Sequence, residues 1–402
     1  MQINPAIRRI LVLDDDAFIL KTVSHALGRL GYPQVVTTSS AVQALTLLSD
    51  DGNAIDFVLC DLNMPEMDGI EFLRELADRG FAGGVALISG EDSRTLKTAE
   101  DLARARRLTV VGVIEKPVRA EALEALLAQW RTEAQEEFSL DPPPVTPEEL
   151  RRAIEAGEFV AFFQPQIELA TGWVAAVEAL ARWKSPGKGM LLPDAFISVA
   201  EQHGLIGPLT ERIMADALGN MAAWRSRGLQ LRMALNVSVE NLKELDFPDR
   251  VLAGILAAGV SPASVILEIT ESRFMANPVA AMDTLVRLRL KKIRLSIDDF
   301  GTGYASLAQL RDIPFDELKV DRTFVRGAAQ DEAARTILEA SIALGQKLGM
   351  SVVAEGVNNQ EDWDRVARLG CHLAQGNFMA QPMPGADIPA WVDAWNARHM
   401  HR

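Results

Sequence analysis

The sequence is poor in cysteine and has no long apolar run. Its 402 residues include two cysteines, Cys60 and Cys371, whose wide separation gives neither a disulfide framework nor a zinc-ligand spacing. The apolar stretch Val251–Val260 is too short to span a bilayer. The apolar start Ile10–Leu13 runs directly into Asp14, unlike the start of a secretory signal. We therefore expect a soluble cytoplasmic protein with no membrane partner.

Positive charge is also scarce. Lys and Arg number 41 against 55 Asp and Glu, which gives a formal net charge of −14. Binding to long nucleic acids requires a basic face, so a nucleic acid polymer is not an expected partner. Hydrophobic residues make up 48% and charged residues 24% of the chain. This composition is typical of globular proteins and excludes disorder for most of the chain.

A proline-rich segment divides the chain. Asp141-Pro142-Pro143-Pro144 cannot continue a helix and favours extended polyproline geometry. We predict an N-terminal domain of residues 1–130, a linker of residues 131–147 and a C-terminal domain of residues 148–402. The last piece has the usual size of a (β/α)8 barrel, roughly 250 residues.

The N-terminal domain alternates buried strands with helical periodicity. Such alternation predicts an α/β fold, a doubly wound five-stranded parallel sheet with its site at the carboxyl edge. The predicted strands are Ile10–Leu13, Val35–Thr37, Phe57–Cys60, Val85–Ile88 and Val110–Ile114.

The C-terminal domain repeats this alternation and predicts a TIM-like barrel. No helix fits between its first two strands, so these should form an antiparallel hairpin and make one strand of the barrel irregular. The predicted strands are Val160–Ile167, Val174–Ala179, Leu231–Asn236, Val265–Ile269, Ile293–Ile297, Glu317–Val320, Ser351–Val353 and His372–Ala374.

Five polar groups follow or end strands of the N-terminal domain. They are Asp14, Asp15, Asp61, Ser89 and Lys116. Carboxylates that converge at one edge need a cation, and oxygen ligands suit Mg²⁺. A carboxylate beside Mg²⁺ and a lysine can accept a phosphoryl group. The alternative is that each aspartate only caps the following helix.

This segment resembles a response-regulator receiver (CheY-like) domain. The resemblance implies Asp61 as phosphoacceptor and metal ligand, Asp14 and Asp15 as ligands of one Mg²⁺, and Ser89 and Lys116 as switch residues. It also implies a cognate histidine kinase as phosphodonor. Val113 stands where the family usually has an aromatic residue. The matching strings are Leu11–Asp16, Leu59–Gly69 and Glu115–Pro117.

Polar residues also follow seven strands of the predicted barrel. Carboxylates that cluster at one mouth predict two Mg²⁺ or Mn²⁺ ions and an in-line phosphoryl displacement. Lys319 among them suits a charged group that orients the attacking water, with a structural ion pair as the alternative. The full set is Glu178, Asn236, Glu268, Asp298, Asp299, Lys319, Glu355 and Gln375.

The C-terminal domain resembles the EAL-domain cyclic diguanylate phosphodiesterases. The resemblance implies Lys319, Glu355 and Glu178 as catalytic residues. The other implied roles are metal ligation by Glu178, Asn236, Glu268, Asp298, Asp299 and Glu355, substrate contacts by Gln164, Arg182 and Gln375, and a loop anchor at Glu271. The matching strings are Phe163–Ile167, Glu178–Arg182, Asn236–Ser238, Glu268–Glu271, Asp298–Gly303, Leu318–Asp321, Ala354–Val357 and Gln375–Gly376.

Two positions depart from this family pattern. Asn358 replaces the glutamate that usually follows the Glu-Gly-Val string, and the usual aromatic residues near Asn377 and Met379 are absent. Neither departure removes a metal ligand.

Together the two resemblances imply phosphorylation-regulated, divalent-metal-dependent hydrolysis of cyclic di-GMP to linear 5'-pGpG, by a homo-oligomer. The bistable element is expected to be the loop of residues 298–307. The alternative is a catalytically silent cyclic-dinucleotide sensor that acts through protein contacts. A DNA-binding regulator would need an output domain for which the barrel leaves no room.

Overall fold

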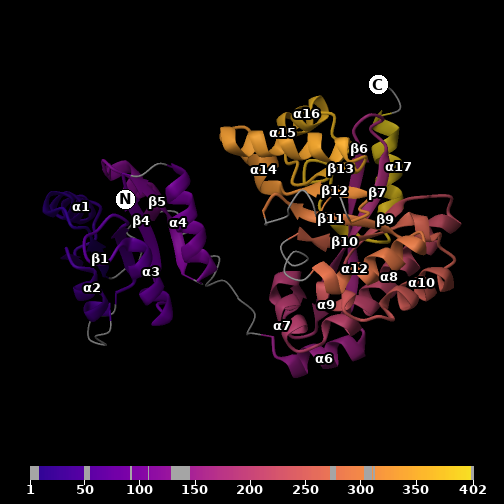
Figure 1. Ribbon diagram of the computed structural model, residues 1–402, viewed down its shortest axis with the longest axis horizontal. Coiled ribbons are helices and arrows are strands. Elements are labelled where there is room, and N and C mark those ends of the chain that lie inside the picture. Colours follow the sequence, from indigo (N-terminus) through magenta and orange to yellow (C-terminus); the bar gives the residue numbers. More distant parts are fainter. Residues whose placement is uncertain are drawn as a thin grey trace. The chain divides into compact units, whose positions relative to one another are not determined.

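The chain folds as two compact units, Met1–Pro143 and Pro144–Arg402, which Figure 1 shows in indigo to violet and in magenta to yellow. The computed structural model describes residues 9–48, 55–90, 93–106, 108–127, 145–271, 278–302, 310 and 313–399. Most of the predicted linker lies outside these residues, and the predicted boundaries at residues 130 and 147 stay predictions. No helix within the described ranges is both long and apolar enough to cross a membrane.

The first unit has a five-stranded parallel sheet in the order β2-β1-β3-β4-β5, which confirms the predicted doubly wound fold. Its central strands are buried throughout because helices cover both faces of the sheet. The strands are β1 (Ile10–Leu13), β2 (Val35–Thr38), β3 (Phe57–Asp61), β4 (Gly84–Ser89) and β5 (Thr109–Glu115). The helices with described bounds are α1 (Ala17–Arg29), α2 (Ala41–Leu48), α3 (Gly69–Asp78) and α4 (Ser93–Ala105), and residues 120–127 are also helical.

The second unit is an eight-stranded barrel that closes by pairing of β6 with β7. Its strands in spatial order are β6 (Phe159–Glu168), β14 (Leu373–Ala374), β13 (Ser351–Ala354), β12 (Glu317–Val320), β11 (Arg294–Phe300), β10 (Val265–Thr270), β9 (Arg232–Asn236) and β7 (Val174–Ser185). Helices alternate with most of these strands, as the periodicity predicts. They are α6 (Pro147–Ala156), α7 (Ile197–Gln202), α8 (Ile206–Ser226), α9 (Val239–Leu242), α10 (Phe247–Ala257), α12 (Pro278–Leu290), α14 (Arg322–Gly327), α15 (Glu332–Lys347), α16 (Gln360–Arg368) and α17 (Ile388–His399).

One strand of the barrel runs against its neighbours. β6 is antiparallel to both β7 and β14, while the remaining barrel pairs are parallel. This confirms the predicted hairpin, which arises because residues 169–173 are too few for a crossover helix.

The structure also has strands that the sequence pattern did not predict. β7 continues to Ser185, well beyond its predicted end at Ala179, and pairs with the short strand β8 (Gly189–Leu191). A second short strand, β15 (Met383–Pro384), pairs with β6. The extension of β7 is stabilised by Trp183, which is buried and stacks on Phe159 with ring centroids 5.2 Å apart.

Candidate active site

The carboxyl edge of the first sheet brings together an acidic cluster and one lysine. Asp14 follows β1, Asp61 ends β3 and Lys116 follows β5. The Lys116 Nζ lies 2.8 Å from Asp14 Oδ2 and 3.0 Å from Asp61 Oδ2. Asp15 completes the cluster, because one carboxylate oxygen from each of the three aspartates lies within 4.8 Å of the others. Ser89 ends β4 at the same edge and is buried.

Helix capping does not account for this cluster. The N-cap of α1 is Asp16, whose side chain accepts a hydrogen bond from the Phe18 amide at 2.7 Å. Asp14 lies two residues before this N-cap, and its Oδ1 accepts a hydrogen bond from the Asp16 amide at 2.9 Å. Helix capping therefore does not explain the positions of Asp14 and Asp15.

The electrostatics of this edge favour a bound cation. Burial raises the pKa of Asp61, although Lys116 opposes the shift. Burial lowers the pKa of Lys116, but its hydrogen bonds to Asp14 and Asp61 outweigh that effect and raise it. Asp61 Oδ1 is buried and makes no hydrogen bond among the residues that the structure describes. Three carboxylates with a spare oxygen fit a Mg²⁺ ion.

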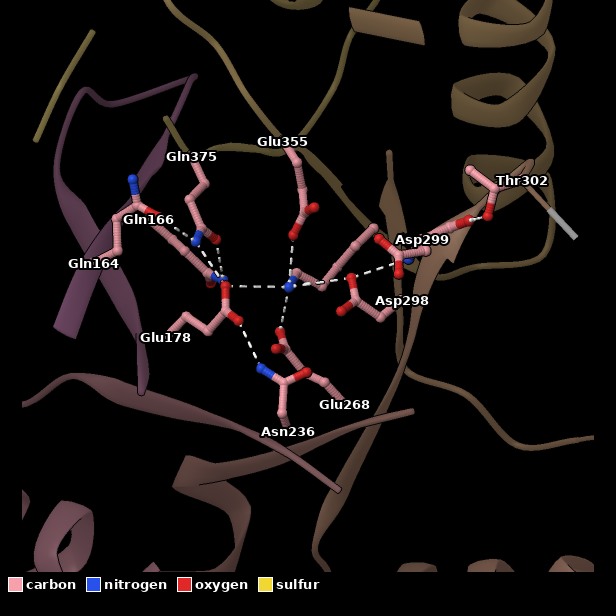
Figure 2. Close-up of polar contacts among 11 residues, drawn as sticks. Gln164, Gln166, Glu178, Asn236, Glu268, Asp298, Asp299, Thr302, Glu355 and Gln375 are labelled. Carbon is pink, nitrogen blue, oxygen red and sulfur yellow. Dashed lines mark hydrogen bonds and ion pairs between the residues drawn. The ribbon is translucent and has the colours of Figure 1, made fainter. Parts of the chain in front are cut away.

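The mouth of the barrel centres on Lys319. Its Nζ lies 3.2 Å from Glu178 Oε2, 3.0 Å from Glu268 Oε1, 3.2 Å from Asp298 Oδ1 and 2.6 Å from Glu355 Oε1. Figure 2 shows these four carboxylates pointing toward one shared nitrogen. The predicted cluster is therefore formed by residues from four strands and from the segment after β13.

Not all of these residues sit at strand ends as the sequence pattern suggested. Asn236 ends β9, and Glu355 and Gln375 directly follow β13 and β14. Glu178, by contrast, lies in the middle of β7, where it faces Gln164 of β6 in the antiparallel register. The hairpin carries β7 past the mouth, so Glu178 reaches the cluster from within a strand.

A local irregularity in β11 presents two consecutive aspartates. The register between β11 and β12 shifts between Ile297 and Phe300, and Asp299 has a left-handed φ of 55°. Regular strand alternation would send Asp298 and Asp299 to opposite faces. The bulge and the left-handed residue instead bring carboxylate oxygens of Asp298, Asp299 and Glu355 within 4.8 Å of one another.

Amide side chains hold Glu178 in place. Its Oε1 accepts from Asn236 Nδ2 at 2.7 Å, and its Oε2 accepts from Gln375 Nε2 at 2.6 Å. Gln375 also donates to Gln164 Oε1 at 3.0 Å, and Gln166 Nε2 donates to Gln375 Oε1 at 2.9 Å. Sequence reasoning missed Gln166, although its place two residues after Gln164 on one strand face was a usable signal.

The ionisation of the barrel site is set by burial and by the lysine. Burial raises the pKa of Glu268 well above its ordinary value, and it raises that of Glu355 to about 8. The pKa of Glu178 is lowered, because Lys319 and the amide donors outweigh burial. Burial alone would lower the pKa of Lys319, but the surrounding carboxylates raise it well above its ordinary value. The surrounding carboxylates therefore favour the protonated form of Lys319.

The donor set fits divalent metal ions. Asp298, Asp299 and Glu355 group their oxygens closely enough for one ion. Glu268 is fully buried; its Oε1 pairs with Lys319 at 3.0 Å, and its Oε2 has no hydrogen-bond partner among the described residues. Carboxylate and amide oxygens without histidine or cysteine suit Mg²⁺ or Mn²⁺.

A cavity of about 830 Å³ opens over this cluster. Gln164, Glu178, Asn236, Asp298, Asp299, Glu355 and Gln375 line it, while Glu268 and Lys319 are fully buried and do not. Arg182 is not a lining residue either: its guanidinium lies 5.7 Å from the centre of the Phe162 ring. The assignment of Arg182 as a substrate contact stays a prediction.

Glu271 lies where the predicted loop anchor should be. Its Oε2 accepts a hydrogen bond from the Gly301 amide at 2.8 Å, just after the two aspartates. Residues 303–309 of that loop lie outside the described residues, so its bistability stays a prediction.

Replacing the central lysine should destabilise the metal-free barrel. Lys319→Met leaves four buried or half-buried carboxylates without their shared cation, and we expect a loss of about 3–5 kcal/mol in the free energy of unfolding in EDTA. Mg²⁺ should stabilise this variant more than the wild type. Tryptophan fluorescence during urea unfolding reports mainly the barrel, because Trp130 is the one tryptophan that precedes residue 144 and the other six follow it.

The matched control is Lys188→Met, which removes a lysine that pairs with Glu149 at 2.8 Å and contacts none of the four carboxylates around Lys319. That change should cost about 1 kcal/mol or less. Equal stability of Lys319→Met and wild type in EDTA would contradict the central role of the ammonium group.

Comparison with known proteins agrees with this geometry. Residues 10–128 match the response regulator receiver domain, and residues 147–382 match the EAL domain. The chain is 32% identical over 378 residues to the cyclic di-GMP phosphodiesterase RocR of Pseudomonas aeruginosa, covering 93% of this chain and 96% of that protein. It is 36% identical over 245 residues to the bifunctional diguanylate cyclase/cyclic di-GMP phosphodiesterase MucR of the same species, covering 61% of this chain and 36% of the relative.

Among solved structures, the PaMucR phosphodiesterase in complex with c-di-GMP matches with a TM-score of 0.58 and 36% identity, over 60% of this chain and 98% of that one. The two family matches lie on the two compact units, and one relative spans nearly the whole of both. The chain therefore belongs to the EAL-domain family, with a response-regulator receiver domain preceding the EAL barrel.

Proposed function

We propose that the barrel hydrolyses one phosphodiester bond of cyclic di-GMP to give linear 5'-pGpG. The observation that carries this proposal is the convergence of Glu178, Glu268, Asp298 and Glu355 on Lys319 beneath an open cavity. The phosphodiesterase names of RocR and of the MucR complex support the same activity.

In this proposal the acidic residues of the mouth, together with Asn236, bind the metal ions. Glu178, Asn236, Glu268, Asp298, Asp299 and Glu355 would hold two Mg²⁺ or Mn²⁺ ions. Ions bound there supply Lewis-acid stabilisation of the charge on the attacking and leaving oxygens. Gln375 donates to Glu178 and to Gln164, and both glutamines line the cavity where they would meet the substrate.

Lys319 positions water rather than deprotonating it. The four carboxylates raise its pKa and so favour the ammonium form, which donates hydrogen bonds. A donor fixed among acids can orient a water oxygen toward the phosphorus atom. Deprotonation then falls to a carboxylate of the mouth, and we assign it to Glu355, whose Oε1 lies 2.6 Å from Lys319 Nζ, nearer than the other three acids.

The competing function is a catalytically silent sensor of cyclic dinucleotides. Such a protein could tolerate loss of a metal ligand or of the lysine, yet each predicted member of the set is present and in contact with another member or close to one. This completeness favours the enzyme.

Two substitutions test the hydrolysis proposal. With cyclic di-GMP and Mg²⁺, we expect Glu178→Ala and Lys319→Met each to lower kcat by about a hundredfold or more, the range for losing a group that activates or orients a nucleophile. Lys319→Met should retain nucleotide binding, whereas Glu178→Ala should bind Mg²⁺ more weakly. Product chromatography and calorimetry measure these effects, with Lys188→Met as the control.

A wild-type protein that binds cyclic di-GMP but forms no 5'-pGpG with either metal would favour the sensor. Near wild-type kcat in Lys319→Met would remove the water-positioning role from this residue.

We further propose that phosphorylation of Asp61 by a cognate histidine kinase regulates the barrel within a homo-oligomer. The support is the cluster of Asp14, Asp15, Asp61 and Lys116, with Ser89 at the same edge. A phosphoryl group on Asp61 would draw Lys116 and the Ser89 hydroxyl toward it and shift the balance between two existing arrangements of the protein.

Acetyl phosphate or beryllofluoride tests this regulation. We expect the hydrolysis rate of the wild type to change, and that of Asp61→Asn to stay constant, because the acceptor carboxylate is gone. Asp16→Asn is the matched control: it removes a neighbouring charge but keeps an α1 N-cap, and it should respond like the wild type. Light scattering on the same samples reports oligomeric state. An unchanged wild-type rate would reject regulation through Asp61.

A further inference from the structure

One wall of the cavity carries two arginines from a single helix. Arg322 and Arg326 are four residues apart on α14 and therefore lie on the same face of the helix. Both line the cavity, together with Gly356 and Asn358 from the chain that follows Glu355. This wall places positive charge beside the acidic mouth.

Gly356 permits the close approach of α14. It has a left-handed φ of 65°, and a methyl group at this position would overlap the Cβ of Arg322 and lie 3.3 Å from Arg326 Nε. The Gly356 carbonyl in turn accepts a hydrogen bond from Arg326 Nε at 3.4 Å. The Arg326 guanidinium is therefore fixed against the segment that carries Glu355.

Asn358 orients this guanidinium without neutralising it. The hydrogen-bonding partners of its amide assign the oxygen to the side of Arg326, where Oδ1 accepts from Nε at 3.0 Å and from Nη2 at 3.1 Å. Asp362, four residues after Asn358, is engaged by Arg365 at 3.2 Å and by the Asn358 amide at 3.2 Å. A glutamate at position 358 would cancel the charge of Arg326, whereas asparagine preserves it.

We propose that Arg326, positioned by Asn358, is a specificity-determining residue that donates hydrogen bonds to the O6 and N7 acceptors of one guanine base. This inference rests on the proposed cyclic di-GMP substrate. Asn358 occupies the Nε side of the guanidinium, and Nη1 makes no hydrogen bond among the described residues. The edge of the guanidinium formed by Nη1 and Nη2 therefore remains available. Its two parallel N–H donors match the paired O6 and N7 acceptors of guanine.

The rest of the cavity supports a base rather than a phosphate at this wall. Divalent ions held at the carboxylate mouth would attract the phosphates, and the bases would then extend along the walls. No aromatic side chain is present among the described residues that line the cavity, so these residues can contact a base only through hydrogen bonds and aliphatic packing. One wall is aliphatic, with Ile206, Leu209, Ile213 and Met214. We therefore expect the hydrogen bonds that recognise a base to come from the polar wall that holds Arg326.

The variant Arg326→Met separates base reading from phosphate binding. For cyclic di-GMP we expect KM to rise about tenfold or more, the effect of losing one bidentate contact to guanine, with kcat unchanged. For bis(4-nitrophenyl) phosphate, a diester without a base, we expect kcat/KM to stay constant. An unchanged KM for cyclic di-GMP overturns the inference. An equal loss with both esters also overturns it, because Arg326 then binds phosphate.

The variant Asn358→Asp tests the positioning role with the guanidinium retained. A carboxylate there neutralises Arg326, so we expect KM for cyclic di-GMP to rise roughly two- to fivefold, as for a partly exposed charge pair, and its dependence on salt to fall. Asn359→Asp is the matched control, because it adds the same charge one residue later and preserves the N-cap of α16. Equal KM values in the two variants would overturn the role of Asn358.

These experiments also distinguish the two proposals. Absence of 5'-pGpG in the wild type rejects the phosphodiesterase itself. If the wild type turns over normally and the KM values of Arg326→Met and Asn358→Asp equal that of the wild type, only the guanine contact is rejected. Thermal melting of each variant shows that the barrel remains folded.

Discussion

The barrel depends on one buried ammonium group among carboxylates. Lys319 contacts acids from β7, β10 and β11 and from the chain after β13, so its ion pairs connect elements that are far apart in sequence. Buried acids at this spacing repel one another and resist ionisation unless a cation is present. The lysine supplies that cation within the chain itself, and the geometry needed to receive metal ions is in place before they bind.

The receiver domain uses the same solution on a smaller scale. Lys116 contacts Asp14 and Asp61 at the carboxyl edge of the sheet, as Lys319 contacts its acids at the mouth of the barrel. A net charge of −14 therefore does not exclude the binding of every anion. Part of the negative charge is concentrated at two sites, and at each of them a lysine lies within ion-pairing distance of the carboxylates.

Much of this arrangement follows from the sequence, because the carboxyl ends of parallel strands meet at one edge. The positions of Asn236, Glu355 and Gln375 follow this rule, and so does the acidic cluster of the receiver. The rule could not place Glu178, which sits within a strand because the hairpin carries β7 beyond the mouth. Nor could it give the left-handed Asp299 or the pairing of Arg326 with Asn358. These features depend on a register shift and on packing between distant segments, which local periodicity does not encode.

The hairpin of β6 and β7 has a consequence for the order of folding. Gln164 and Glu178 are directly opposite residues of one antiparallel pair, so a short turn is enough to bring them together. Gln375, which bonds both, is 197 residues from Glu178 and can arrive only when the barrel closes. Hairpins form in about 1–10 μs, and contacts of low sequence separation cost the least loop-closure entropy. We therefore expect the β6–β7 side of the mouth, with Gln164 and Glu178, to form first. The last strands then complete the site by pairing with this hairpin.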